Sequence, residues 1–144
     1  IWLDYPKYEE ELNVVKRTTS GERTSLKHIL TAEQITGYQE LIRKLPVADN
    51  VYEYAVKLAA STRPDTPSAS AKVNEFVNWG AGPRASQYLI IGAKTHAALN
   101  GKFSPDIEDV RMVASPILRH RIVRNYKAEA EGITVEDIIA DLVK

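Results

Sequence analysis

The residues best suited to chemistry stand together in the segment 80–86, Gly-Ala-Gly-Pro-Arg-Ala-Ser. Its two glycines allow tight backbone turns that other residues resist, and Pro83 suits the first position of a helix, where its missing N–H costs nothing. Arg84 would then lie in the first turn, where the positive end of the helix favours anions, and its planar guanidinium could contact a phosphate. The segment therefore predicts a phosphate-contacting arginine. An ordinary helix start with a solvated arginine is the alternative that so short a motif leaves open.

A second candidate is a run of basic residues that contains no acid between positions 119 and 127. As a binding surface it would contact a nucleotide, nucleic acid or an acidic neighbouring subunit, whereas its plainer interpretation is a solvated face. The whole chain has 19 Lys and Arg against 19 Asp and Glu, so it has no net field to attract nucleic acid or an anionic membrane. The run consists of Arg119, His120, Arg121, Arg124 and Lys127.

No complete active site is evident. A phosphate-binding loop needs G-x-x-x-x-G-K-[ST], but the one Gly-Lys pair, at 101–102, is followed by Phe103. The histidines match no metal-ligand spacing, so we expect no metal site. His96, on a predicted helix near an apolar stripe, is interpreted as a hydrogen-bonded core residue, and the early-helix acid pair 108–109 as a dipole and capping feature. The other histidines are His28 and His120.

Composition indicates an ordinary globular protein. The chain has 144 residues, of which 44% are hydrophobic and 26% charged, enough for one domain with a real core. It has no cysteine, which excludes disulfides and thiolate metal sites and is typical of a cytoplasmic protein. No apolar run approaches the ~20 residues needed to cross a bilayer, so we expect no membrane span.

Apolar periodicity and capping residues predict a mainly α fold, a helical bundle of six helices. The second helix should bury a stripe formed by Ile35, Tyr38, Leu41, Ile42 and Leu45. Small residues on the helix from Pro83 to about Leu99, Gly92 among them, should let a neighbouring helix come close. The helices are predicted to begin at Pro6, after the cap Thr31, at Asp49 or Asn50, at Pro83, after the cap Ser104 and after the cap Thr134.

Two further segments bear on how the glycine loop is held. A turn-rich stretch covers 63–70. It is followed by apolar residues that we expect to pin the loop to the body of the domain, namely Val73, Phe76, Val77 and Trp79.

At the start of the chain, Ile1-Trp2-Leu3 is predicted to form a short strand. Because a lone strand usually belongs to a sheet, we interpret the chain as a fragment of a larger protein. A trimmed N-terminus is the alternative.

These residues resemble a known family. The segment 80–86 is similar to the sensor 2 motif of AAA+ ATPases of the MoxR type, and the similarity continues through Asn-Gly-Lys at 100–102, Glu-Asp-Val at 108–110 and Val-Ala-Ser-Pro-Ile-Leu-Arg-His-Arg at 113–121. The opening Tyr-Pro followed by Glu-Glu-Glu-Leu resembles the end of that family's ATPase core. One departure is Gly82, where serine is more usual, which should make the loop somewhat more flexible.

The resemblance implies a helical AAA+ lid domain over 18–144, after the end of an α/β ATPase core over 1–17, similar to the lid of the magnesium chelatase ATPase subunit. Gly82, Pro83 and Arg84 would contact ATP, with Arg84 as the catalytic arginine, acting in cis or in trans, while the missing upstream core would hold Mg²⁺. Arg119 and Arg121 would lie at a subunit interface.

The same resemblance implies partners and a limit. It implies hexameric rings, a von Willebrand A-type partner protein, and chaperone-like remodelling of client proteins. The isolated fragment lacks Walker motifs, so it should hydrolyse no ATP, and it should bind ATP poorly because most phosphate contacts are absent. The competing interpretation from the residues is a helical binding module that uses the 119–127 patch for nucleic acid or an acidic protein.

Overall fold

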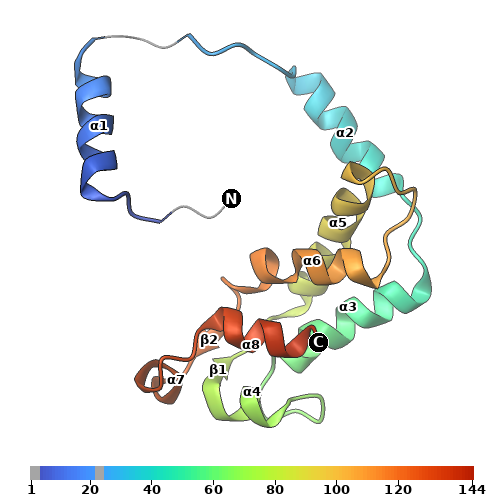
Figure 1. The fold of residues 1–144 in the computed structure, drawn as a ribbon. Helices are drawn as coiled ribbons and strands as arrows, with labels where there is room; N and C mark the ends of the chain where they lie inside the picture. Colours follow the sequence, from blue (N-terminus) through green and yellow to red (C-terminus); the bar gives the residue numbers. More distant parts are fainter. Residues whose placement is uncertain (1–3, 22–24) are drawn as a thin grey trace. The chain divides into compact units, whose positions relative to one another are not determined.

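The computed structural model describes residues 4–21 and 25–144 and confirms the mainly α fold class (Figure 1). A two-stranded antiparallel sheet pairs Val77 with Arg124 and Trp79 with Val123. The predicted strand stub at 1–3 lies outside the described residues. The elements are α1 (Tyr8–Thr19), α2 (Ala32–Lys44), α3 (Asp49–Ser61), α4 (Ala71–Phe76), β1 (Val77–Trp79), α5 (Pro83–Leu99), α6 (Ile107–Leu118), β2 (Val123–Arg124), α7 (Tyr126–Ala130) and α8 (Val135–Leu142).

The chain divides into two units, the first ending at Thr36 and the second beginning at Gly37. In the first unit, α1 buries none of its side chains. The second unit holds the hydrophobic core and every element from α3 to α8. A boundary after residue 17, which the sequence predicts between an ATPase core and a lid, remains a prediction.

The core of the second unit is built around α5, which packs against both α6 and α3 (Figure 1). A Cβ built on Gly92 of α5 would lie 2.7 Å from Ile117 Cδ1 and 3.2 Å from Val113 Cγ2 of α6. The predicted small face of this helix therefore does allow a neighbouring helix to come close. The largest fully buried apolar side chains are Leu89, Leu118, Ile138, Ile139, Val73 and Val110.

The stripe predicted to be buried on the second helix is not buried in α2. In α3, apolar residues on one side of the helix are all buried, namely Val51, Ala55, Leu58 and Ala59. In α2, by contrast, no residue is buried: Ile35, Tyr38 and Leu41 are exposed within the described structure, and Ile42 and Leu45 are half-buried. The prediction of a buried stripe is wrong because periodicity identifies an apolar face but not an element that covers it.

Helix starts follow the local chemistry of capping. Thr31 caps α2 as predicted and forms a capping box with Gln34: Gln34 N–H donates to Thr31 Oγ1 at 3.2 Å and Thr31 N–H to Gln34 Oε1 at 2.9 Å. The Thr134 cap is confirmed as well. The Ser104 cap is wrong: Asp106 caps α6 instead, because its carboxylate and that of Asp109 each accept the other's backbone N–H.

Two short helices escaped the sequence analysis. α4 is capped by Ser70, whose Oγ accepts from Val73 N–H at 3.2 Å, and α7 by Asn125, whose Oδ1 accepts from Ala128 N–H at 3.0 Å. Each spans too few turns for an apolar period to show.

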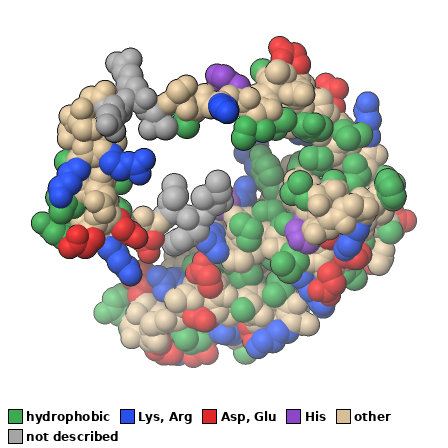
Figure 2. Space-filling view, turned by 45° about the horizontal axis from the view of Figure 1, so that its top comes forward, with side chains coloured by type: hydrophobic (Ala, Val, Ile, Leu, Met, Phe, Trp, Pro, Cys, Tyr) green, Lys and Arg blue, Asp and Glu red, His purple; other side chains and the backbone are tan. Residues whose placement is uncertain are grey.

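The surface charge is mixed: on the face drawn in Figure 2, acidic and basic side chains are interspersed rather than gathered by sign. None of the described helices is long and apolar enough to cross a membrane.

Candidate functional site at the loop before α5

The candidate site is the loop that joins β1 to α5. Gly82 is the N-cap residue of α5, with extended backbone (φ −79°, ψ 178°), and Pro83 is the first helical residue, as predicted. A Cβ built on Gly82 would meet no atom within 4 Å, so this corner of the loop is open. The sequence therefore located the helix start correctly, and the structure adds what holds the loop in place.

The end of α3 clamps the loop through both polar groups of Ala81. The buried Thr62 hydroxyl accepts from Ala81 N–H at 2.8 Å and donates to Ala59 C=O at 2.7 Å. Arg63 Nε–H donates to Ala81 C=O at 2.9 Å. Because Ala81 is buried, these bonds satisfy backbone groups that water does not reach. Sequence analysis missed Thr62 and Arg63, and no local pattern relates them to a loop so distant in sequence.

Removal of the Thr62 hydroxyl should weaken this clamp. We expect Thr62→Val, which nearly preserves the shape of the side chain, to lower the free energy of unfolding by about 1–3 kcal/mol, because it leaves the buried Ala81 N–H without an acceptor. Urea denaturation of the chain measures this, with Thr36→Val as a control, since the Thr36 hydroxyl bonds only to its own helix at Ala32 C=O. Equal stability of the two variants would contradict the clamp.

Gly80 shows how closely the loop lies on α3. A Cβ built there would be 2.3 Å from Thr62 O and 2.6 Å from Arg63 Cα, both backbone atoms that cannot swing aside. Only glycine fits this contact without moving the backbone. The first glycine of the motif is thus required by packing, whereas the second lies in open space.

Arg84 is the second residue of α5 and its side chain is exposed. It makes no hydrogen bond or ion pair with any other described residue, so its guanidinium is available to a ligand. The structure places Gly82, Pro83 and Arg84 together at one exposed corner of the second unit. This arrangement suits an anion contact, and it leaves the predicted role in ATP binding as a prediction.

A pocket of about 470 Å³ lies beside the loop. The expectation that Trp79 pins the loop to the body is wrong, because the side chain is 73% exposed and forms a wall of this pocket. Regular alternation along β1 would place Trp79 on the same face as the buried Val77, but the pairing with β2 is irregular between these two residues. Val73, Phe76 and Val77 are buried, as predicted, whereas Trp79 is not. The pocket is lined by Arg63, Pro64, Asp65, Asn78, Trp79 and the residues 80–83.

The two predicted interface arginines differ in their surroundings. The Arg121 guanidinium lies over the Tyr88 ring at 5.1 Å and donates from Nη1 to Ile117 C=O at 2.7 Å. Because Tyr88 follows Arg84 by four residues on α5, Arg121 and Arg84 belong to the same surface. Arg119 instead pairs with Glu136 at 3.2 Å and is largely buried.

The remaining basic residues of the 119–127 run also contact the protein itself. Arg124 Nη1 donates to Ile133 C=O at 2.5 Å, and Lys127 Nζ pairs with Glu75 at 2.5 Å. Lys127 also lies over the Phe76 ring at 5.7 Å. These side chains therefore bond within the domain rather than forming the simply solvated face of the plainer interpretation, and they give no support to a continuous basic surface for nucleic acid.

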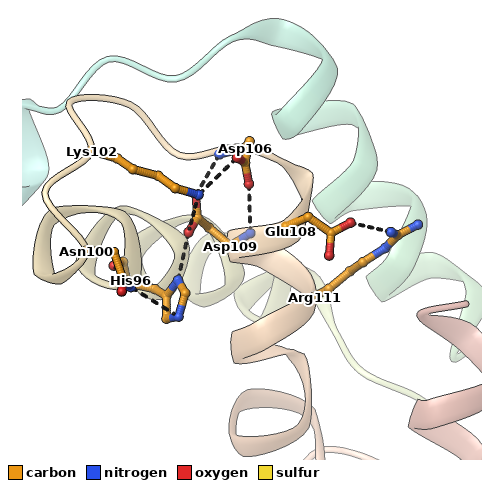
Figure 3. A network of polar contacts seen from close by, with 7 residues as sticks. All are labelled: His96, Asn100, Lys102, Asp106, Glu108, Asp109 and Arg111. Carbon is orange, nitrogen blue, oxygen red and sulfur yellow. Dashed lines mark hydrogen bonds and ion pairs between the residues drawn. The ribbon is translucent and has the colours of Figure 1, made fainter.

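A separate polar network joins the end of α5 to the start of α6 (Figure 3). The fully buried Asp109 carboxylate accepts hydrogen bonds from Asp106 N–H at 2.9 Å, His96 Nδ1–H at 2.7 Å and Lys102 Nζ at 3.1 Å. His96 is hydrogen-bonded, as predicted, but its side chain is 32% exposed rather than in the core. The capping role predicted for the acid pair is confirmed for Asp109.

Asp109 should make the fold sensitive to acid. Burial raises the pKa of this carboxyl, but hydrogen bonds from the Asp106 backbone, His96 and Lys102 outweigh it and lower the pKa from 3.8 to about 2. A lowered pKa stabilises the fold above the unfolded-state value, and this stability is lost as pH falls through the folded value. The free energy of unfolding should thus drop by about 2 kcal/mol between roughly pH 4 and pH 2 through this group.

The measurement is chemical denaturation across that pH range. Asp109→Asn should be less stable at neutral pH and should lose this part of the acid dependence. Asp106→Asn is the matched control, because asparagine caps helices as well as aspartate does and leaves Asp109 in place. An unchanged acid slope in Asp109→Asn would show that other groups cause it.

Comparison with known proteins identifies the domain. The model of the AAA lid domain family matches residues 69–142, which include the loop, α5, α6 and α8. The chain belongs to the AAA lid domain family. The chain is 31% identical over 137 residues to Chaperone MoxR1 of Mycobacterium tuberculosis, covering 95% of this chain and 36% of MoxR1. It is also 27% identical over 142 residues to the uncharacterized protein YeaC of Bacillus subtilis, covering 98% of this chain and 42% of YeaC.

A solved structure agrees with these relatives. The lid domain superposes on a Cytophaga hutchinsonii protein inferred to be an ATPase with a TM-score of 0.78 and 30% identity, over 98% of this chain and 43% of that one. The resemblance to MoxR-type lids is thereby confirmed. The chain spans less than half the length of each of these relatives.

Proposed function

We propose that this lid domain serves a MoxR-type AAA+ ATPase as its sensor of bound ATP, with Arg84 as the residue that contacts the phosphates. The observation that carries the proposal is the state of Arg84. Its guanidinium is exposed and has no partner among the described residues, and it lies in the first turn of α5, directly after a loop held by the end of α3. An unpaired cation at a fixed position is what recognition of a polyanion requires.

The residues around Arg84 fit a phosphate ligand. Gly82 offers no side chain that would hinder an approaching phosphate, and Pro83 starts the helix without an N–H of its own. When bound, ATP supplies the phosphate bond to be hydrolysed, and Mg²⁺ would be held by an ATPase core outside this chain. Arg84 would place positive charge against the phosphates, where charge neutralisation and positioning account for most of the catalysis of phosphoryl transfer.

The clamp suggests how nucleotide state reaches the rest of the lid. Because Ala81 is bonded to the end of α3, a pull on Arg84 would act on α3 as well as on α5. Since α3, α5 and α6 share one core, they would move together, and hydrolysis would change the angle of the lid as a whole.

The wider role follows from the family. We propose that the complete protein is cytoplasmic and forms hexameric rings, in which Arg84 of one subunit faces the ATP held by the next subunit. It would remodel or activate client proteins and have a von Willebrand A-type protein among its partners. The name of MoxR1 as a chaperone supports the remodelling role. Arg121, on the same surface as Arg84, is the better placed of the two predicted interface arginines.

ATP hydrolysis by the complete ATPase carrying Arg84→Ala tests the proposal. A folded variant with normal turnover would refute the role of Arg84.

A further inference from the structure

We propose that Arg63 is a second phosphate-contacting arginine, which binds the same triphosphate as Arg84 from the pocket beside the loop. The inference rests on the proposed function, because the triphosphate is the ligand it assigns to Arg84. No motif in the sequence marks Arg63, which lies just beyond the end of α3. Its place in the structure does, because it lines the pocket together with Gly82 and Pro83, the residues directly before Arg84.

One hydrogen bond holds the Arg63 side chain in position and leaves most of its donors free. A guanidinium has five N–H donors. In Arg63, the Nε–H donates to Ala81 C=O at 2.9 Å. Its Nη groups make no hydrogen bond or ion pair with other described residues. The side chain is half-buried, which strengthens any contact made with a charged ligand. Arg63 therefore presents an oriented pair of free donors, the geometry that binds phosphate oxygens bidentately.

The two arginines lie within reach of one ligand. Arg63 is anchored at the carbonyl of Ala81, and Arg84 follows Ala81 by three residues. Three residues span at most about 11 Å even when fully extended. Because the Arg63 guanidinium already lies at the Ala81 carbonyl, the flexible Arg84 side chain needs only to extend back along this span for both groups to contact neighbouring phosphates of one triphosphate.

The charges in the pocket favour a polyanion over a single carboxylate. Asp65 also lines the pocket, while its backbone N–H donates to Asn74 Oδ1 at 2.8 Å. Its carboxylate offsets part of the positive potential of Arg63 and Arg84, and it repels any anion that binds there. This repulsion also grows with the charge of the ligand, so a triphosphate is favoured over a monoanion only because it contacts both arginines at once. The remaining polar neighbour, Asn78, carries no charge.

Tripolyphosphate tests the inference on the 144-residue chain. Side-chain ¹⁵N NMR would follow the Arg63 and Arg84 guanidinium signals, assigned from Arg63→Lys and Arg84→Lys, as tripolyphosphate replaces chloride at constant ionic strength. We expect both sets of signals to shift with one shared dissociation constant. Trp79, in the wall of the pocket, should change its fluorescence over the same concentrations, measured in a Trp2→Phe background so that Trp79 is the single tryptophan.

The variants measure how much each arginine contributes. Arg63→Lys and Arg84→Lys should each weaken tripolyphosphate binding by about threefold to tenfold, because lysine keeps the charge but loses the planar fork. Arg43→Lys, at an exposed arginine of α2, is the matched control and should bind as the wild type does. Thr62→Val loosens the loop with both arginines intact. If it weakens binding as much as Arg63→Lys, Arg63 acts through the loop and the inference fails.

Other outcomes separate the inference from the proposed function. If the Arg84 signals respond and those of Arg63 do not, Arg63 is no ligand and the role of Arg84 stands. If sulfate at equal ionic strength produces the same shifts, or if adenosine alone moves the Arg63 signals, the pocket does not read a triphosphate. If the signals of neither arginine shift, the inference is overturned as well. The proposed function is judged separately, by ATP hydrolysis in the ATPase that carries Arg84→Ala.

Discussion

Arg84→Ala in the complete ATPase is expected to lower the rate of ATP hydrolysis by about 10³- to 10⁵-fold, the range that a phosphate-contacting arginine contributes in related chemistry. Steady-state phosphate release measures the rate. The fold should be unaffected, because the exposed Arg84 side chain makes no contact that the described structure would lose. Thermal unfolding of the variant checks this point.

Two further variants sharpen the interpretation. Arg84→Lys should recover part of the rate, because it restores the charge without the bidentate geometry. Arg43→Ala, at an exposed arginine on α2, should hydrolyse ATP at the wild-type rate. If Arg84→Ala raised KM and left kcat unchanged, Arg84 would bind ATP equally in the ground state and the transition state, and its assigned part in catalysis would be wrong.

Gly80→Ala should be the most destabilising small substitution in the loop, with a loss of about 3 kcal/mol or more. The new Cβ would overlap the Thr62 carbonyl oxygen and the Arg63 Cα. Because these are backbone atoms, the strain can be relieved only if the loop separates from α3, which also breaks the hydrogen bonds of Ala81. Urea denaturation of the 144-residue chain measures the loss.

The second glycine provides the control. Gly82→Ser places a side chain in open space at an N-cap position, where serine is at least as favourable as glycine, so stability should stay within about 0.5 kcal/mol. If Gly80→Ala were as stable as Gly82→Ser, the close contact between the loop and α3 would be absent in solution.

The features that the sequence predicted correctly are determined by residues close to one another in the chain. The start of α5 at Pro83 and the caps Thr31 and Thr134 depend on residues within one or two turns. Such interactions leave a readable pattern. The location of the candidate site followed from the same kind of signal, because Pro83 and Arg84 are adjacent.

What the sequence did not predict depends on contacts between distant segments. The bonds of Thr62 and Arg63 to Ala81 join parts of the chain separated by a loop and a helix, and no spacing rule connects them. The exposure of Trp79 is not revealed by its apolar character, because it accompanies an irregular pairing of β1 with the distant β2. The stripe on α2 was read as buried because an apolar face was visible and the lack of a covering element was not.

The hydrogen bonds to both the amide and the carbonyl of Ala81 have a thermodynamic consequence for the binding of a ligand at this loop. An unrestrained loop would lose about 1–2 kcal/mol of backbone entropy for each residue that a ligand ordered. Here that loss occurs when the domain folds. A ligand that arrives later needs to fix only the rotamers of an arginine side chain, so more of the electrostatic attraction remains as affinity.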